Sequence, residues 1–67
     1  MEKIIECEIK RKKYENEVYV TYHNGVTEKL FRYYPDELTF SSSEFLGLTK
    51  DEALRLYHKR DIEYLQN

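Results

Sequence analysis

The first half of the chain alternates apolar and polar residues in the way that half-buried strands do. Within residues 3–12, Ile5, Cys7 and Ile9 alternate with charged side chains, a period of two that predicts a strand with one face in the core. Residues 17–22 and 26–34 are rich in β-branched and aromatic residues, which predicts two further strands. The short connections between the segments predict a three-stranded antiparallel β-meander.

The second half of the chain changes to helical spacing. Pro35 ends the third strand, because proline has no N–H to donate to a ladder. Residues 43–46 predict a short helical turn, and residues 50–66 predict a C-terminal α-helix that begins with a Thr49–Glu52 capping box. Apolar residues recur along this helix at positions Ala53, Leu54, Leu56, Tyr57, Ile62, Tyr64 and Leu65. We therefore expect one small α+β domain over residues 1–67, with the helix packed on one sheet face.

The turn at His23–Gly25 allows two strand registers. A two-residue loop sets Val18 opposite Phe31, and it sets a charged side chain opposite Val20. A three-residue loop that ends in a glycine bulge sets Val18 opposite Leu30 instead. We favour the second register, because it keeps charge out of the core.

This choice of register determines which aromatic residues are exposed. It places Tyr19, Phe31 and Tyr33 together on the face opposite Leu30, beside Lys29. One helix covers only one sheet face, so we expect these four residues to contact a protein partner or a second copy of the chain. The alternative is that the additional aromatic residues pack beneath the apolar segment 35–48.

Composition limits the chain to a single small core. It has 67 residues, of which 40% are hydrophobic and 15% aromatic, and one cysteine. A chain of this length is marginally stable alone, and one cysteine rules out an internal disulfide, so we expect aromatic packing or a partner to supply the stability. The first ten residues contain no long apolar run, and we expect a cytoplasmic protein without a membrane anchor.

Four consecutive cations beside a tyrosine are the main alternative site. Lys10, Arg11, Lys12, Lys13 and Tyr14 could neutralise phosphates while a base stacks on the ring. Lysines also occur on edge strands, where they discourage unwanted pairing, and a strand divides neighbouring side chains between its two faces. The remainder of the chain is acidic, and the formal net charge is −2, so nucleic-acid binding would depend on this run alone.

No combination of residues predicts catalysis or a cofactor. His58 and Asp61 can meet on one helix face, but no nucleophile or glycine-rich loop accompanies them. Cys7, His23 and His58 are too few for a structural zinc site. We expect a protein that is not an enzyme and that binds no metal or cofactor.

Small size, acidity and high aromatic content, together with the missing catalytic signature, define the general character of the chain. In this character it resembles the small accessory proteins of phages and other mobile elements, many of which inhibit a host enzyme or defence complex. The resemblance implies a protein-binding module, an inhibitor or adaptor, that acts through the aromatic sheet face and the acidic surface. Nucleic-acid binding through residues 10–14 is the alternative.

Overall fold

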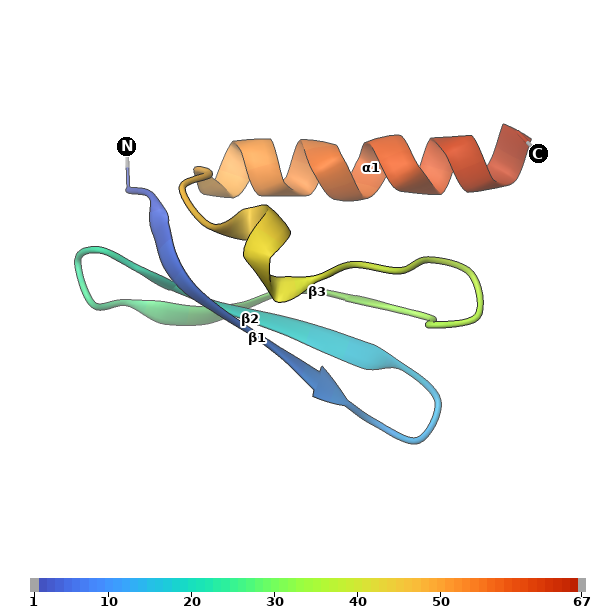
Figure 1. The fold of residues 1–67 in the computed structure, drawn as a ribbon, viewed down its shortest axis with the longest axis horizontal. Coiled ribbons are helices and arrows are strands. Elements are labelled where there is room, and N and C mark those ends of the chain that lie inside the picture. Colours follow the sequence, from blue (N-terminus) through green and yellow to red (C-terminus); the bar gives the residue numbers. More distant parts are fainter. Residues whose placement is uncertain (1, 67) are drawn as a thin grey trace.

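The computed structural model describes residues 2–66, which form a three-stranded antiparallel sheet with a helix across one face (Figure 1). The strands β1 (Ile4–Arg11), β2 (Asn16–Tyr22) and β3 (Thr27–Tyr33) lie in the order β1-β2-β3. The 3-10 turn η1 (Ser42–Phe45) and the helix α1 (Lys50–Gln66) follow. The predicted α+β meander with a C-terminal helix is confirmed.

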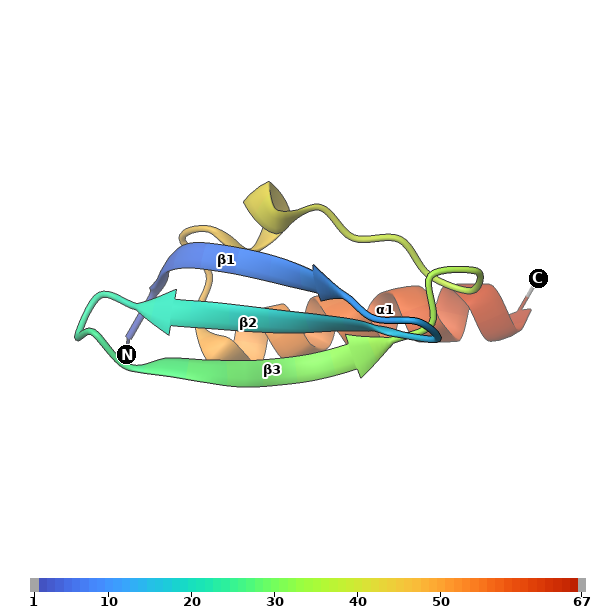
Figure 2. The same ribbon diagram turned by 90° about the horizontal axis from the view of Figure 1, so that it is seen from below.

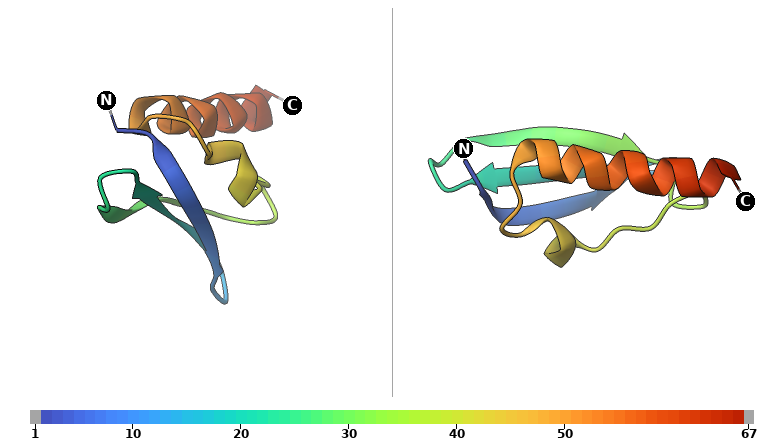
Figure 3. Two further views of the ribbon diagram at one scale, coloured as in Figure 1. Left: turned by 60° about the vertical axis from the view of Figure 1, so that its left-hand side comes forward. Right: turned by 90° about the horizontal axis from the view of Figure 1, so that it is seen from above.

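One face of the sheet is covered and the other is open. Viewed from below and from above, α1 lies across β2 and β3, whereas the segment that contains η1 runs along the outer side of β1 (Figures 2 and 3). We call the face beneath α1 the covered face and the opposite one the open face. The C-terminal end of α1 extends beyond the strands in Figure 1, and its apolar residues Ile62, Tyr64 and Leu65 are consequently exposed.

The capping box at the start of α1 is present as predicted. The Thr49 backbone N–H donates to Glu52 Oε1 at 2.9 Å, and the Glu52 N–H donates to Thr49 Oγ1 at 3.3 Å. These bonds satisfy two of the donors that a helix N-terminus leaves unpaired. Within residues 2–66, no helix has both the length and the apolar character needed to cross a membrane.

The loop between β2 and β3 has the three-residue form that we favoured. The Tyr22 N–H donates to the Val26 carbonyl at 2.9 Å, and the Gly25 N–H donates to the Tyr22 carbonyl at 2.8 Å. Gly25 has a φ of 91°, in the left-handed region that glycine enters without a Cβ clash. Thr21 therefore lies opposite Thr27, as this loop requires.

A second irregularity, at Leu30, changes the register halfway along the same hairpin. Tyr19 lies opposite Lys29, but Val18 lies opposite Phe31. Leu30 is thus the additional residue of a β-bulge, which offsets the rest of β3 by one position. The prediction that Val18 faces Leu30 is wrong, because one bulge was expected where the hairpin has two.

The bulge places Phe31 and Tyr33 on the covered face, so the prediction that they lie beside Tyr19 is also wrong. The Phe31 ring stacks on Tyr57 of α1 at a centroid distance of 4.4 Å. Tyr33 is 5% exposed, and its ring packs edge-on against Phe40 at 5.0 Å. The alternative that we left open, in which aromatic residues pack beneath segment 35–48, describes these two residues.

β1 also contains a bulge, and it moves the first buried residue. The register shifts between Ile4 and Glu6, so Ile4 is buried and Ile5, which was expected on the apolar face, is 53% exposed. Cys7 and Ile9 keep their predicted place against the core and are half-buried. The complete set of buried apolar residues is Ile4, Val18, Val20, Tyr22, Tyr33, Leu38, Phe40, Phe45 and Ala53.

Candidate functional site

The open face is a network of paired polar groups. Lys29 Nζ lies 2.9 Å from Glu17 Oε2, and the Tyr19 hydroxyl donates to Glu17 Oε1 at 3.3 Å. The hydrogen bond from Lys29 lowers the pKa of Glu17, and the same bond raises the pKa of Lys29. Tyr19 and Lys29 do lie together on this face, as predicted. Because they bond to the same carboxylate, they do not form an apolar docking surface.

The basic run of residues 10–13 is divided among several places. Lys10 Nζ lies over the Tyr19 ring on the open face, 4.4 Å from its centroid. Lys12 Nζ lies 3.9 Å from Glu17 Oε1, and Lys13 Nζ lies 5.3 Å from the ring centroid of the exposed Tyr14. A continuous cationic patch is therefore absent from this part of the described chain.

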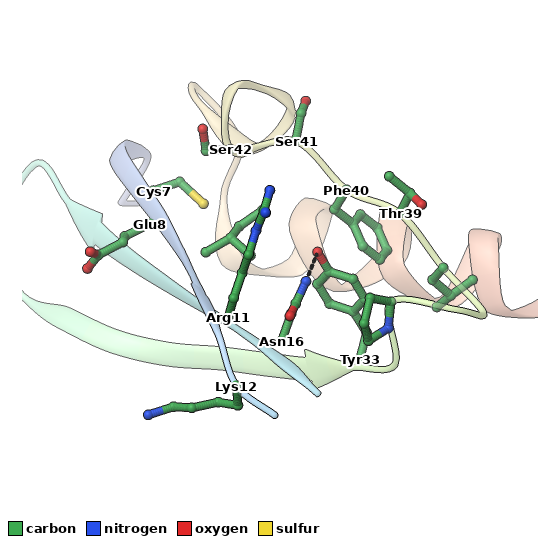
Figure 4. A pocket seen from close by; sticks show the side chains of 13 residues that line it. Cys7, Glu8, Arg11, Lys12, Asn16, Tyr33, Thr39, Phe40, Ser41 and Ser42 are labelled. Carbon is green, nitrogen blue, oxygen red and sulfur yellow. Dashed lines mark hydrogen bonds between the residues drawn. The ribbon is translucent and has the colours of Figure 1, made fainter. Parts of the chain in front are cut away.

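Arg11 points toward the covered side of the sheet. Its side chain extends into a groove of about 780 Å³ between β1 and residues 35–42 (Figure 4). We call this the β1 groove. Cys7, Ile9 and Arg11 line it from β1, and the facing wall includes Leu38, Phe40, Ser41 and Ser42.

The groove exists because β1 and the segment beside it separate. At one end the Ile4 N–H donates to the Leu48 carbonyl, and the Gly47 N–H donates to the Ile4 carbonyl, each at 2.8 Å. Beyond Ile4 the strand diverges from the segment, as the left view of Figure 3 shows. The groove is therefore closed near Ile4 and open near Arg11.

Arg60 holds the facing wall to α1. Its Nη1 donates to the Thr39 carbonyl at 2.8 Å, and its guanidinium lies 4.8 Å from the Phe40 ring centroid. It also forms an ion pair with Glu44, whose carboxylate in turn accepts the Ser41 N–H at 2.7 Å. The Arg60 hydrogen bond lowers the pKa of Glu44, and the carboxylate raises the pKa of Arg60. The wall is thus positioned by charged contacts as well as by packing.

The polar groups inside the groove differ in whether they have partners. Asn16 is buried, and its Nδ2 donates to the Tyr33 hydroxyl at 3.3 Å (Figure 4). The Cys7 thiol points into the groove (Figure 4), and burial raises its pKa, so it is mainly protonated at neutral pH. The Arg11 side chain has no ion pair or hydrogen bond with any residue between 2 and 66.

The groove offers several kinds of contact for binding. It combines a half-buried apolar floor at Cys7 and Ile9, a cation and several hydroxyls. His58 and Asp61, the pair considered from the sequence, lie on α1 outside its lining. Sequence analysis identified Arg11 within the basic run but did not predict the groove, because its far wall is a segment without periodicity.

Comparisons of the chain with protein-family models, with curated proteins and with solved structures found no match. No relative therefore suggests a partner or substrate. The side chains of the β1 groove are what indicate a function.

Proposed function

We propose that the protein is a non-enzymatic protein-binding module, an inhibitor or adaptor, and that it receives an extended segment of its partner in the β1 groove. The observation that carries the proposal is a groove of ligand size beside an unpaired strand edge. Its 780 Å³ lies within the range of sites that bind small ligands and short segments. Among residues 2–66, no backbone hydrogen bond joins Glu6–Arg11 to any segment except β2.

This site replaces the aromatic sheet face as the proposed partner-binding surface. Phe31 and Tyr33 are held in the aromatic core, and removing them from it would expose several buried rings. Tyr19 and Lys29 are bonded to Glu17, so a partner that docked there would have to displace existing bonds. The groove requires neither change.

A protein partner is favoured over nucleic acid by the distribution of charge. Nucleic-acid binding requires several cations along a phosphate backbone, and residues 10–13 point to different places. The formal net charge of −2 adds long-range repulsion of phosphates.

The half-buried Cys7 thiol fits a reducing compartment such as the cytoplasm, where thiols persist.

A groove-filling variant tests the proposal. Ser42 lines the groove and Ser43 does not, although both are exposed residues of η1. The tagged wild-type chain, Ser42→Trp and Ser43→Trp would each be used as bait in a lysate of the source cells. We expect Ser42→Trp to lose a protein that the other two retain.

Two outcomes would contradict the proposal. Retention of the same protein by Ser42→Trp would place its binding site elsewhere. Sedimentation of the purified chain tests whether the partner is instead a second copy of the same chain. A concentration-dependent dimer that Ser42→Trp disrupts would show that it is. Circular dichroism of both tryptophan variants provides the control for folding.

A further inference from the structure

We infer that the partner segment adds as a strand to the free edge of β1 and presents a carboxylate to Arg11. The inference rests on the proposed function and specifies its ligand: an extended acidic peptide segment. Three features of the β1 groove support it, namely the state of Arg11, the geometry of the edge and the alternation of the floor.

Arg11 differs from its neighbours in having no partner. Lys10 lies over the Tyr19 ring and Lys12 lies near Glu17, whereas Arg11 points into the groove toward Ser41 and Ser42 (Figure 4). A guanidinium presents a planar set of donors that matches a carboxylate in a bidentate pair. A peptide carboxylate at this position would give Arg11 a partner, as Lys10 and Lys12 already have.

The edge of β1 already pairs with backbone at its other end. Lys3 and Thr49 form an antiparallel bridge, and both backbone groups of Ile4 bond to residues 47–48. The residues that precede this pair form η1 and lie away from the edge, so the row of backbone pairing stops after Ile4. An added strand would continue the same row along the stretch from Cys7 to Arg11. Strand addition of this kind derives its affinity from main-chain hydrogen bonds.

The other edge of the sheet lacks these properties. β3 is bulged at Leu30, which interrupts any ladder that a new strand would form. It also carries Lys29 and Arg32, and each is paired with a glutamate. A bulge in the middle of a strand protects that edge from pairing, whereas the bulge in β1 lies between Ile4 and Glu6 and leaves the stretch from Cys7 to Arg11 regular. The β1 edge is therefore the one that we assign to the partner.

The floor of the groove specifies the pattern of the segment. Cys7 and Ile9 line the groove and are half-buried, and the Glu8 carboxylate points away from the groove (Figure 4). Side chains of a strand alternate between faces, so the segment would place small apolar residues over Cys7 and Ile9. In this antiparallel direction an aspartate or glutamate would precede them on the same face, beside Arg11.

Capped peptides test the inference directly. The probe is an acetylated and amidated peptide of alternating valine and threonine with one glutamate, and its counterparts carry glutamine or lysine at that position. Titration into ¹⁵N-labelled protein should shift the backbone amides of Cys7–Arg11. We expect the glutamate peptide to bind roughly fivefold more tightly than the glutamine peptide, and the lysine peptide to bind most weakly.

Matched charge variants show whether Arg11 is responsible. Arg11→Gln should bind the glutamate and glutamine peptides equally. Arg55→Gln removes the same charge from an exposed position of α1 and should keep the preference. If Arg11→Gln still binds the glutamate peptide more tightly than the glutamine peptide, the inference is wrong. It is also wrong if the amide shifts are centred on β3 or α1.

Failure of the inference can be distinguished from failure of the proposed function. If no peptide shifts Cys7–Arg11 but Ser42→Trp still loses the captured protein, strand addition is wrong and the groove remains the binding site. If single-stranded oligothymidylate shifts the Arg11 amide at lower concentration than the glutamate peptide does, the inferred ligand is also wrong. Equal binding of the three peptides would exclude a role for charge.

Discussion

The covered and open faces of the sheet use aromatic residues in opposite ways. On the covered face, Phe31 and Tyr33 contact rings from the segments above them, including Phe40 and Tyr57. On the open face, Tyr19 lies among charged residues and donates a hydrogen bond to Glu17. The first arrangement gains its stability from burial and ring geometry, whereas the second consists of solvent-screened polar contacts.

This difference between the faces indicates which part of the sheet still has groups free to bind a partner. The covered face is filled at its centre by the aromatic cluster, and the open face has bonded its own charges to one another. At the border of the covered face, β1 diverges from residues 35–42 and leaves a free strand edge and the unpaired Arg11. Binding is therefore assigned to an edge between layers and not to either face.

Removal of a buried ring should cause the largest loss of unfolding free energy. It would show how much more the packing on the covered face contributes to stability than the contacts on the open face. Phe45 is fully buried and contacts Phe31 and Phe40. Phe45→Ala should cost about 3–5 kcal/mol of unfolding free energy, and Tyr19→Ala about 1 kcal/mol or less. Urea denaturation measures both, and Phe45→Leu gives a milder variant if the alanine chain does not fold. Equal losses for Phe45 and Tyr19 would refute the division into faces.

The Glu44–Arg60 ion pair should give the next largest effect. Both side chains are less than one-third exposed, and charged hydrogen bonds of this kind contribute about 2 kcal/mol. We expect Glu44→Gln to lose about this amount at pH 7, whereas Glu8→Gln on the open face should be close to neutral.

The pH dependence of this loss has a defined sign. The pKa of Glu44 is lower in the folded chain than its usual 4.5, so its contribution is present above pH 4.5 and disappears as the pH falls through the folded value. The difference in unfolding free energy between wild type and Glu44→Gln, measured by urea denaturation, should therefore be full at pH 7 and shrink as the pH is lowered below 4.5. A difference that persists at low pH would show that the ion pair is not its source.

Deletion of Leu30 tests whether the bulge itself is needed for Phe31 to lie on the covered face. Without this residue Phe31 would follow Lys29 directly and still lie opposite Val18, so the ladder becomes regular and no side chain changes face. The expected cost is about 1 kcal/mol, because Leu30 is only partly buried against the core. NOE contacts between the Phe31 and Tyr57 rings should persist. Their loss in a chain that remains folded would show that the bulge is needed for Phe31 to reach the core.

Much of the fold could be predicted because it depends on local patterns. The alternation in β1, the turn glycine Gly25 and the Thr49–Glu52 capping box each act over a few residues. The bulge at Leu30 could not be predicted, because nothing in the stretch from Thr27 to Tyr33 marks which residue is additional. It follows from the fit of Phe31 against Tyr57, a contact with a helix that comes much later in the chain.

The candidate site was predictable only in part, for a related reason. Arg11 was identified within the basic run, and its place on the same side as Cys7 and Ile9 follows from strand alternation, but the groove that it enters does not. The opposite wall depends on Arg60, whose contacts with Thr39 and Glu44 join distant parts of the chain. Such contacts leave no periodic signal in the sequence.

The smallest expected effect is a difference in cysteine reactivity. It compares a thiol in the β1 groove with a thiol on the open face. Cys7 is the single cysteine, and burial raises its pKa, so less of it is thiolate at neutral pH than in an exposed thiol. A cysteine at position 19 on the open face, made by Tyr19→Cys in a Cys7→Ser background, lacks this burial. We expect the thiol at position 19 to react faster with iodoacetamide at pH 7.5, and the ratio to approach one in 8 M urea. Equal rates in the folded state would mean that the β1 groove admits solvent as freely as the open face, and it would then lack the apolar floor that an added strand requires.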